Sequence, residues 1–419
     1  MSSVIVGLGY VGLPLAQAAA AAGIEVVGFD TNERVVAALN AGRSHVDDIS
    51  DAEVARMLES GFRATSDPAA LAGAEYIVIC VPTPLDETGG PDLRAVLGAT
   101  ETIAANLQPG TTVILESTTY PGTTEEVVQP ILERGGLRAG IDFHLAFSPE
   151  RVDPGNRTYT ITNTPKVVGG IDPASTVRAS AFYARFVDEV VPASGTREAE
   201  TAKLLENTYR HINIALVNEM AQFSHQMGID IWEVVRLART KPFGFQSFSP
   251  GAGVGGHCIP IDPNYLAYKV RAVLDRPFRF VELAEEINGA MPGYVARRVQ
   301  DLLNDHGLPL RGSRVTLLGV TYKPDISDRR ESPAVPLAAR LRELGGELAY
   351  HDPRVEDWDV DGLAVPRVAT VAEALATSDV VVVVQPHREY LEAAAQLSGP
   401  ATPVLDATGR FEGSQVVRL

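Results

Sequence analysis

The sequence predicts an α/β protein with two Rossmann-like, parallel-sheet domains joined by a helical segment that contains one long central helix. Short apolar runs alternate with helical stretches in the first 195 residues and again after residue 306, and this alternation is typical of β-α-β units. Between them, residues 197–228 place apolar residues at helical spacing, with no proline or glycine before Gly228. A helix of that length extends about 45–50 Å. We therefore expect domains at 1–195, 196–305 and 306–419.

The first β-α-β unit carries a dinucleotide-binding motif. Its expected elements are a strand at 4–6, a helix at 13–22 and a second strand at 25–29. The G-x-G-x-x-G residues that we expect to bind a cofactor are Gly7, Gly9, Tyr10, Val11 and Gly12. Such glycines admit a pyrophosphate to the helix N-terminus, and an acidic residue at the end of the second strand, here Asp30, accepts the ribose hydroxyls. Asp30 would repel a 2′-phosphate, so NAD is favoured over NADP. Arg34 either covers the adenine or ribose or is a solvated helix residue.

Polar residues follow several later strands of this domain. The expected strands are 76–81, 112–116, 144–147, 166–170 and 189–192. Pro82 and Thr83 follow the first of them, and a hydroxyl-rich turn containing Thr118 follows the second. Ligands bind at the carboxyl ends of parallel strands, although a hydroxyl of this turn also suits the N-cap of a helix starting near Thr124. Glu150 follows the strand at 144–147 and is a candidate base; by itself it also reads as a surface charge.

Two features of the middle segment point to chemistry. On the long helix, Lys203, Asn207 and His211 recur every four residues and share one face. Lys203 and Asn207 suit a polar pair directed into a cleft. His211 is expected to be a satisfied core or surface histidine, that is, one whose ring nitrogens have hydrogen-bond partners. The helix itself is a natural dimer surface.

The second feature is the glycine-rich loop at 251–263. It presents Cys258, with Asp262 four residues later and prolines at 260 and 263. Glycine lets a ligand or another backbone approach closely. A thiol beside a carboxylate suggests covalent catalysis, and the alternative is a buried structural cysteine. Cys80, inside a predicted strand, is expected to fill the core.

The rest of the chain is predicted as two helices and a second α/β domain. The helices are expected near 264–274 and 281–304. The second domain is expected to contain strands at 314–319, 347–351, 380–384 and 404–406 and a helix at 333–344. This domain lacks a G-x-G-x-x-G motif.

Composition excludes several classes of partner. The net charge of −17 argues against nucleic acid or an anionic membrane, because either needs a basic face. Two cysteines give no disulfide framework and favour a reducing compartment. We expect no signal peptide, because the first apolar run leads straight into the glycine motif, and no run is long enough to span a bilayer. The expected location is the cytoplasm, and no metal site is expected.

Taken together, these motifs resemble those of the UDP-glucose/GDP-mannose dehydrogenase family over nearly the whole chain. The stretches in family order are Gly7–Gly12, Glu116–Thr123, Ser148–Arg151, Lys203 with Asn207, Gly255–Pro263, Tyr322–Pro324 and Asp328–Pro333. The resemblance implies a soluble homodimer that oxidises the C6 alcohol of a UDP-sugar to a carboxylate with two NAD. All five lysines, at 166, 203, 241, 269 and 323, fall within stretches that look like motifs of this family. The resemblance accounts for their presence in an arginine-rich chain, because a guanidinium does not substitute for an ammonium at such positions.

The resemblance also implies residue roles. Cys258 is the nucleophile, Asp262 and Lys203 manage the first proton, and Asn207 helps to hold an oxyanion. Glu150 serves thioester hydrolysis, with Thr118 positioning the water. Pro82, Thr83, Thr118 and Arg330 join the cofactor-binding residues. The expected substrate-binding residues are Glu150, Arg151, Lys203, Asn207, Lys241, Phe248, Gly255 and Lys323.

The stretches at 241–263 and 148–156 are closest to the branch that acts on UDP-N-acetylhexosamines. UDP-N-acetylglucosamine or a related UDP-hexose is therefore the expected substrate. Departures at Gln385–His387 and Asp406–Arg410, where Thr-Asp-His and Asp-x-Arg-Asn are commoner, leave UDP-glucose or dTDP-glucose as alternatives. Two hypotheses assign the chain to other functional classes: a non-catalytic nucleotide-sugar binder and a simple two-electron dehydrogenase.

Overall fold

The computed structural model describes residues 2–86, 89–151, 153, 156, 158–256, 258–399 and 401–419. Within them the chain forms two compact units. Unit 1 comprises the chain up to Glu206 together with Asn264–Arg276, and unit 2 comprises Asn207–Pro263 together with Pro277–Leu419. Each unit is built on one mainly parallel sheet, which confirms the predicted α/β class.

The described part of unit 1 contains an eight-stranded sheet with the order β3-β2-β1-β4-β5-β6-β7-β8. The strands are β1 (Ser2–Val6), β2 (Glu25–Phe29), β3 (Arg63–Thr65), β4 (Tyr76–Ile79), β5 (Thr112–Leu115), β6 (His144–Phe147), β7 (Lys166–Gly170) and β8 (Val190–Pro192). Neighbouring strands are parallel except that β7 runs antiparallel to β6, with Ala146 opposite Gly170. The predicted strands are therefore confirmed, while β3 was not predicted.

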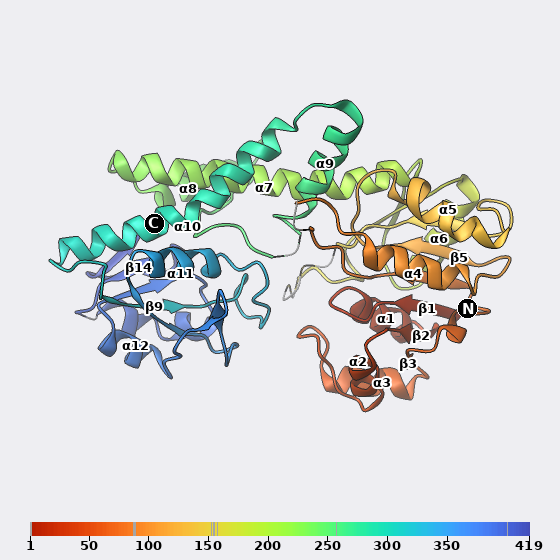
Figure 1. Ribbon diagram of the computed structural model, residues 1–419, viewed down its shortest axis with the longest axis horizontal. Helices are drawn as coiled ribbons and strands as arrows, with labels where there is room; N and C mark the ends of the chain where they lie inside the picture. Colours follow the sequence, from red (N-terminus) through yellow and green to blue (C-terminus); the bar gives the residue numbers. More distant parts are fainter. Residues whose placement is uncertain are drawn as a thin grey trace. The chain divides into compact units, whose positions relative to one another are not determined.

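Helices cover both faces of this sheet (Figure 1). They are α1 (Gly12–Ala21), α2 (Glu33–Asn40), α3 (Asp51–Glu59), α4 (Arg94–Ala104), α5 (Gln129–Leu132) and α6 (Pro173–Tyr183), with short helical turns η1 (Pro68–Leu71), η2 (Thr124–Val128) and η3 (Glu133–Gly135). Ile5 and Val78 face α1 and α6, whereas Val4 and Ile77 face α4. Alternate strand residues thus enter two separate cores, which explains the continuous apolar runs.

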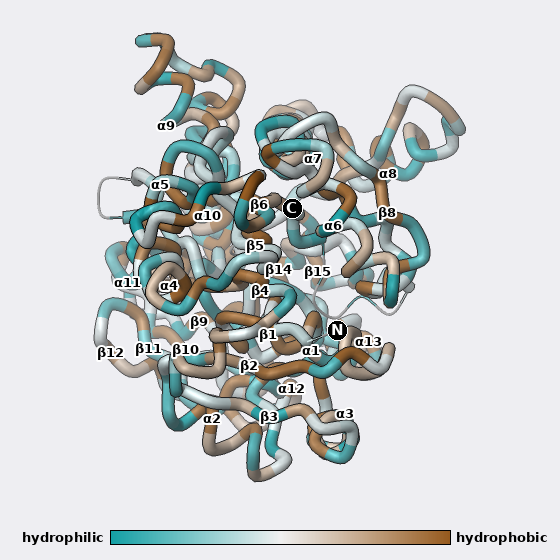
Figure 2. Tube along the Cα trace, turned by 90° about the vertical axis from the view of Figure 1, so that its right-hand side faces the viewer, coloured by the Kyte–Doolittle hydropathy of each residue, from teal (hydrophilic) through white to brown (hydrophobic). Residues whose placement is uncertain are grey.

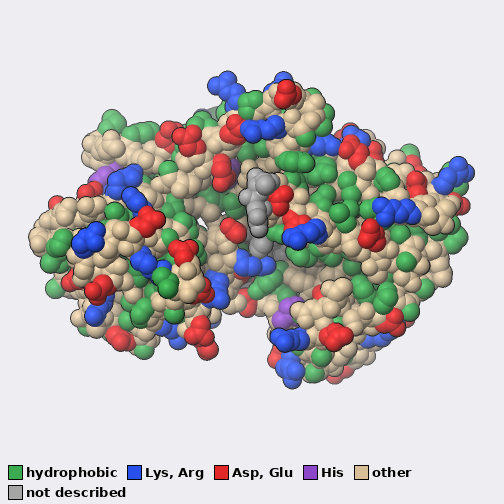
Figure 3. All heavy atoms as spheres, in the orientation of Figure 1, with side chains coloured by type: hydrophobic (Ala, Val, Ile, Leu, Met, Phe, Trp, Pro, Cys, Tyr) green, Lys and Arg blue, Asp and Glu red, His purple; other side chains and the backbone are tan. Residues whose placement is uncertain are grey.

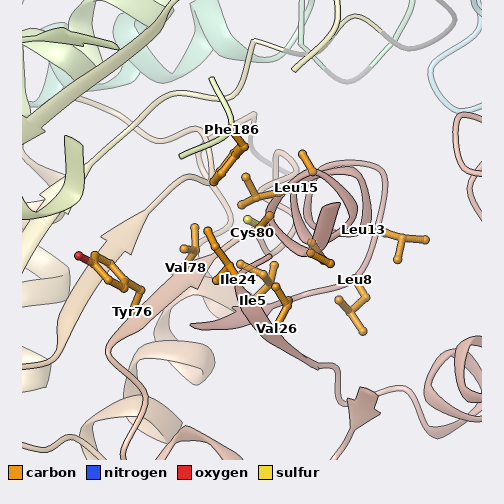
Figure 4. Packing of buried hydrophobic residues seen from close by; sticks show 14 of the residues in the cluster. Ile5, Leu8, Leu13, Leu15, Ile24, Val26, Tyr76, Val78, Cys80 and Phe186 are labelled. Carbon is orange, nitrogen blue, oxygen red and sulfur yellow. The ribbon is translucent and has the colours of Figure 1, made fainter. Parts of the chain in front are cut away.

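Cys80 lies in the first of these cores (Figure 4). It is 6% exposed and packs with Ile5, Leu15, Val78 and Phe186. Burial raises the pKa of its thiol well above the usual range. The prediction that Cys80 fills the core is confirmed.

Unit 2 repeats the architecture with five strands in its described part, in the order β10-β9-β13-β14-β15. These are β9 (Arg314–Leu318), β10 (Glu347–His351), β13 (Val380–Val383), β14 (Val404–Asp406) and β15 (Val416–Arg418), all joined in parallel; β11 (Asp359–Val360) and β12 (Leu363–Ala364) form a small antiparallel pair. Val315 and Val382 pack against α10 and α11 (Ala334–Glu343), whereas Val381 and Val383 pack against α12 (Val371–Thr377), α13 (Arg388–Glu392) and α14 (Ala394–Ser398). In Figure 2 the strands are largely brown, and the helices alternate brown with teal.

The helical segment consists of α7 (Thr196–Gln226), α8 (Ile231–Ala238), α9 (Asp262–Leu274) and α10 (Arg279–Asp305). The predicted long helix is confirmed: α7 is one continuous helix of 31 residues, drawn in lime green in Figure 1. Four large apolar side chains on it are exposed in the single chain, namely Leu205, Tyr209, Leu216 and Phe223, and so is Met227 directly after its end.

The surface carries charges of both signs. On the face drawn in Figure 3, Lys and Arg side chains lie interspersed with Asp and Glu. Among the described residues, none of the helices combines the length and the apolar character that crossing a membrane requires.

Candidate active site

The β1–α1 loop has the geometry of a dinucleotide site. A Cβ added to Gly7, which has φ of +90°, would lie 2.7 Å from Cys80 O, and one on Gly12 would lie 1.8 Å from Gly7 O. A Cβ on Gly9 meets no described atom within 4 Å. The first and third glycines therefore allow tight packing, while the second leaves open space at the start of α1, where a pyrophosphate binds. Gly7, Gly9 and Gly12 therefore fit the approach of the NAD pyrophosphate.

The Asp30 carboxylate is fixed beside this loop. It accepts hydrogen bonds from the N–H groups of Leu8 at 2.9 Å and Asn32 at 2.8 Å. These bonds orient the carboxylate at the end of β2 and leave further lone pairs on its two oxygens for ribose hydroxyls. Arg34 is exposed in the first turn of α2, so its contact with the cofactor stays a prediction.

The segments after β4 and β5 are held from other elements of unit 1. Tyr265 of α9, which is fully buried, donates its hydroxyl hydrogen bond to Thr83 O and also lies 3.1 Å from Pro84 O. Ser117 Oγ donates to Val81 O at 2.7 Å. Thr118 is half-buried in the turn after β5. The structure therefore brings Pro82, Thr83 and Thr118 to the same edge of the sheet.

The N-terminus of η2 is capped by a residue that the sequence did not indicate. Glu200 of α7 accepts hydrogen bonds from Gly122 N at 2.6 Å, Thr124 N at 2.9 Å and Thr124 Oγ1 at 2.7 Å. Thr123 Oγ1 donates instead to Tyr120 O. The alternative that a hydroxyl of the 117–123 turn provides the N-cap is therefore wrong, because a buried carboxylate takes these donors. Burial raises the pKa of Glu200 to about 7, and the three hydrogen bonds lower it only in part.

Glu150 lies in a buried cluster of ionisable groups after β6. It is 7% exposed, so its reading as a surface charge is wrong. Lys166 of β7 forms an ion pair with Glu116, and its Nζ lies 3.8 Å from Glu150 Oε2. Tyr183 of α6 donates a 2.6 Å hydrogen bond to Glu116 Oε2. Burial raises the pKa of Glu116; Lys166 opposes this shift and Glu150 adds to it.

Lys203 connects α7 to the same segment. It is 7% exposed, and its Nζ donates a 2.7 Å hydrogen bond to the backbone oxygen of Glu150. The neighbouring Arg151 donates to Pro165 O at 2.7 Å and pairs with Glu206. Unit 1 therefore brings Lys203, Glu150 and Arg151 together, as a site built from these residues requires.

In unit 2, Cys258 is exposed, so the alternative of a buried structural cysteine is wrong. The N–H of Asp262 donates a 2.9 Å hydrogen bond to Cys258 O, which closes the turn between them. Asp262 is 2% exposed and accepts a 2.5 Å hydrogen bond from Asn207 Nδ2. An accessible thiol thus sits one helical turn from a buried, hydrogen-bonded carboxylate.

The glycines of this loop are required by its neighbours within unit 2. A Cβ on Gly255 would lie 2.6 Å from Glu331 O, and one on Gly256, with φ of +89°, would lie 2.8 Å from the Tyr322 ring. The segment 319–333 that approaches them also contains Asp325 and Glu331 in the left-handed region, with φ of 65° and 51°. Such conformations cluster at ligand sites.

A chain of buried amides holds the start of the glycine loop. Asn218 accepts a 3.0 Å hydrogen bond from Gly251 N and donates to Asn288 Oδ1 at 2.9 Å. Asn288 in turn donates to His211 O at 3.2 Å, and His211 Nε2 lies 3.4 Å from Glu285 Oε2. His211 is 1% exposed, which places it in the core. Its Nε2 has no hydrogen-bond partner among the described residues, so the prediction of a satisfied histidine is wrong for this nitrogen.

The other predicted ligand residues lie on loops of unit 2. Lys241 Nζ lies 5.1 Å from the centroid of the exposed Phe243 ring, and Phe248 packs edge-on against Tyr209 at 5.9 Å. Arg330 forms a bidentate pair with Asp328, with a shortest distance of 2.6 Å. Lys323 is half-buried on the same segment as Arg330. Four residues of the predicted motifs, Val152, Pro154, Gly155 and His257, lie outside the described residues.

Sequence reasoning missed the supporting residues Glu200, Asn218 and Asn288 and the pairing of Glu116 with Lys166. Two signals were present: Lys166 is one of five lysines in an arginine-rich chain, and Glu200 shares a helix face with Lys203. Among the described residues, the structure contains no cluster of three or more His, Cys, Asp or Glu side chains suited to a metal ion.

The fold and these sites define an NAD-dependent oxidoreductase with a second nucleotide-binding domain. The chain belongs to the UDP-glucose/GDP-mannose dehydrogenase family. Residues 1–187 match its NAD binding domain, 197–290 its central domain and 316–411 its UDP binding domain. It is thus an NAD-dependent nucleotide-sugar dehydrogenase, and the predicted family and cofactor are confirmed.

Three similar proteins illustrate the relationship. Protein CapL of Staphylococcus aureus is 36% identical over 93% of this chain and 90% of its own length. UDP-N-acetyl-D-glucosamine 6-dehydrogenase of Pseudomonas aeruginosa is 36% identical over 85% and 83%, respectively. The solved UDP-D-ManNAc dehydrogenase of Pyrococcus horikoshii superposes with a TM-score of 0.91 at 31% identity, over 100% of this chain and 98% of that one.

Proposed function

We propose that this enzyme oxidises the C6 alcohol of a UDP-N-acetylhexosamine to a uronic acid, through a thiohemiacetal and then a thioester on Cys258. UDP-N-acetylglucosamine or a closely related UDP-hexose is the substrate. One observation carries the proposal: an exposed Cys258 lies one turn from the buried Asp262–Asn207 pair, on a loop that resembles the N-acetylhexosamine branch of the family. Relatives named for UDP-N-acetyl-D-glucosamine and UDP-N-acetyl-D-mannosamine support it.

The proposed chemistry balances over two oxidations. NAD, when bound, accepts one hydride from the sugar carbon in each oxidation. The alcohol first loses a hydride and a proton to give the C6 aldehyde. The Cys258 sulfur then adds to the aldehyde carbon, loss of a second hydride and a proton leaves a thioester, and water releases the acid and restores the thiol.

The first proton and the oxyanions are assigned to three residues. In this proposal the Asp262 carboxylate and the Lys203 ammonium, acting through a water molecule, assist removal of the proton that the alcohol loses. Asn207 and Lys203 donate hydrogen bonds to the oxygen that becomes negative when the thiol adds. A compact ammonium suits this task because its charge is strongest on one small atom.

Hydrolysis of the thioester is assigned to Glu150. Its carboxylate accepts a proton from the attacking water, while Thr118 orients that water. The position of Glu150 after β6, with its backbone fixed by Lys203, supports this role. The assignment leaves Glu150 uninvolved in either hydride transfer, which makes it separable from Cys258 by kinetics.

Residues of unit 2 are assigned to the nucleotide sugar. We propose that Lys241, Phe248, Gly255 and Lys323 contact the substrate and that Arg330 contacts NAD, with Arg151 as a further substrate ligand. The functional segments are 1–195 for NAD, 196–305 for the cysteine loop and dimerisation, and 306–419 for the nucleotide. The enzyme works in the reducing cytoplasm, where Cys258 stays a thiol.

We also propose that the enzyme is a homodimer through α7. The exposed apolar residues Leu205, Tyr209, Leu216 and Phe223 of α7 recur at intervals of about one or two helical turns, and the exposed Met227 follows directly after the helix. Such a stripe on a long helix marks a surface that another helix covers.

A substrate panel followed by NADH absorbance tests the proposal. The purified protein is given UDP-GlcNAc, UDP-ManNAc, UDP-glucose, UDP-galactose, dTDP-glucose and GDP-mannose. We expect the highest kcat/KM for a UDP-N-acetylhexosamine and two NADH per sugar. One NADH per sugar indicates a two-electron dehydrogenase, and a higher kcat/KM for UDP-glucose or dTDP-glucose overturns the substrate assignment.

A further inference from the structure

After β5 and β6 of unit 1 lies a buried group of three charged residues, two of which, Glu116 and Lys166, have no role in the proposed chemistry. Glu116 is fully buried, Lys166 is 3% exposed and Glu150 is 7% exposed. Each comes from a different part of the sheet: Glu116 follows β5, Lys166 begins β7 and Glu150 follows β6. A charge placed here interacts strongly with its neighbours because little water screens it.

The single ammonium is shared by two carboxylates. Lys166 Nζ bonds to Glu116 Oε1 and lies 3.8 Å from Glu150 Oε2. Burial works against the charge of Lys166, but Glu116 and Glu150 outweigh burial and raise its pKa. The ammonium is therefore retained, and two anions beside one cation leave an excess negative charge whose burial is costly unless a proton is taken up.

The two carboxylates also act on each other. Glu150 raises the pKa of Glu116 both by its charge and by a side-chain hydrogen bond. Tyr183 donates its hydroxyl to Glu116 and not to Glu150, and Lys166 lies 5.0 Å from the centroid of the Tyr183 ring. Protonation of one carboxylate therefore changes the proton affinity of the other.

We propose that Lys166 and Glu116 are positioning residues for Glu150: the ammonium, 3.8 Å from Glu150 Oε2, favours the Glu150 anion, the Glu116 carboxylate on the same ammonium favours its acid, and their balance lets Glu150 take a proton from water and return it. This inference deepens the proposed function, because it rests on Glu150 as the base of thioester hydrolysis. The proposed function assigns the contact with the reacting water to Glu150, whereas Glu116 and Lys166 act through it.

Ionisable groups from several parts of unit 1 surround the carboxylates of Glu116 and Glu150. Besides these two, they are Lys166 of β7, Tyr183 of α6, Cys80 after β4 and Lys203 of α7. Cys80, at the end of β4, is a buried neutral thiol whose pKa burial raises and whose neighbours include Glu116, Glu150 and Lys166. Lys203 of α7 adds a second cation, but its ammonium is directed at the backbone oxygen of Glu150. Lys166 Nζ, by contrast, lies 3.8 Å from a carboxylate oxygen of Glu150.

Lys166 and Glu116 carry opposite charges, so neutralising each of them should shift the protonation of Glu150 in opposite directions. In Lys166→Gln the carboxylates lose their shared cation, so the acid limb of the kcat–pH profile moves to higher pH by about one unit or more. In Glu116→Gln the competing anion is removed, so the same limb moves to lower pH. Tyr183→Phe deletes one donor to Glu116, makes that anion less favourable and moves the limb in the same direction as Glu116→Gln.

A second readout works without substrate. Infrared titration of the carboxylic acid band, with Glu150→Gln identifying the Glu150 contribution, follows protonation of Glu150 directly. If this titration shifts in opposite directions in Lys166→Gln and Glu116→Gln but the kinetic limb does not follow, the positioning inference holds and the hydrolytic role of Glu150 is what fails.

A double variant serves as the control for misfolding of the single variants. Glu116→Gln with Lys166→Gln removes both charges of the buried ion pair together, so neither partner is left as an uncompensated buried charge. We expect it to fold, to bind NAD as the wild type does and to return the limb to between the two single variants. The inference is overturned if the single variants shift the Glu150 titration in the same direction, or if both lose activity with an unmoved titration, as a merely structural pair would.

Discussion

At the residue scale, the thiol of Cys258 and the carboxylate of Glu150 are assigned to different stages of one reaction. Cys258→Ala should still bind NAD and nucleotide sugar, because neither site depends on the thiol. It should make no acid, and any first hydride transfer should leave free or hydrated aldehyde. NADH absorbance with chromatography of the products checks this. Formation of the acid at near wild-type rate would show that the covalent mechanism is wrong for this enzyme.

Glu150→Gln should fail later than Cys258→Ala. The amide keeps the size of the side chain but cannot accept a proton from water. We expect a burst of about two NADH per active site and then a slow phase, about 10²–10⁴-fold below wild-type turnover. Intact-protein mass spectrometry of the stalled enzyme should show a uronyl adduct on Cys258. Absence of both burst and adduct would place Glu150 before the thioester or outside the mechanism.

Glu200 gives a prediction about pH and stability. Its folded-state pKa is raised to about 7 from a usual value of 4.5, chiefly by burial. Because the folded state then holds a proton that the unfolded state releases, the free energy of unfolding falls as pH rises from about 4.5 to about 7. Glu200→Gln cannot lose this proton, so its stability should fall less over that range.

Urea unfolding of both proteins at pH 5 and pH 7.5 measures this difference. Glu200→Gln should also be less stable than the wild type at pH 5, because an amide nitrogen cannot accept from Gly122 or Thr124, and an unsatisfied buried donor costs about 1–3 kcal/mol. Equal pH dependence in the two proteins would mean that Glu200 is ionised throughout the range.

At the element scale, Gly9 and Gly12 of the β1–α1 loop are expected to have different roles, Gly9 in cofactor binding and Gly12 in folding. Gly9→Ala places a methyl group where it meets no described atom within 4 Å, so stability should be unchanged. The methyl lies where the pyrophosphate approaches, and the Kd for NAD should rise about tenfold or more. Gly12→Ala instead places its Cβ 1.8 Å from Gly7 O and should lower the Tm sharply. Calorimetric titration with NAD and thermal unfolding distinguish the two.

A matched control comes from α4. Gly98 is exposed within that helix, and a Cβ there meets no described atom within 4 Å. Gly98→Ala should leave NAD affinity unchanged and raise stability by about 0.5–1 kcal/mol, because alanine favours the helix. If Gly9→Ala binds NAD as tightly as Gly98→Ala does, the pyrophosphate does not approach the loop at Gly9.

At the scale of the whole molecule, the apolar stripe of α7 predicts the oligomeric state. Leu216→Glu places a charge among side chains that a second copy would bury, and we expect sedimentation velocity to show a monomer where the wild type is a dimer. Val177 of α6 is 67% exposed and belongs to a different surface of the chain. Val177→Glu should therefore remain a dimer, and a wild-type monomer would contradict the proposed interface.

The sequence by itself determined the α/β class, the NAD site and the long helix. The glycine motif, its flanking strands and Asp30 lie within the first 30 residues, and the spacing of apolar residues over 197–228 has the period of a helix. Such signals are local, because backbone geometry sets the periods 2 and 3.6. The closeness of Cys258 and Asp262 in the chain is local in the same sense, whereas the sequence left open whether Cys258 is exposed or buried, and the structure shows it exposed.

Only the tertiary structure decided what supports these residues. The Glu116–Lys166 pair joins residues 50 positions apart, the Asn207–Asp262 bond 55 and the Glu200 cap 78. It also decided the antiparallel direction of β7 and showed that Gly255 and Gly256 are glycines because Glu331 and Tyr322 lie against them. Local periodicity carries no information about these contacts, since they depend on which strands become neighbours in the sheet.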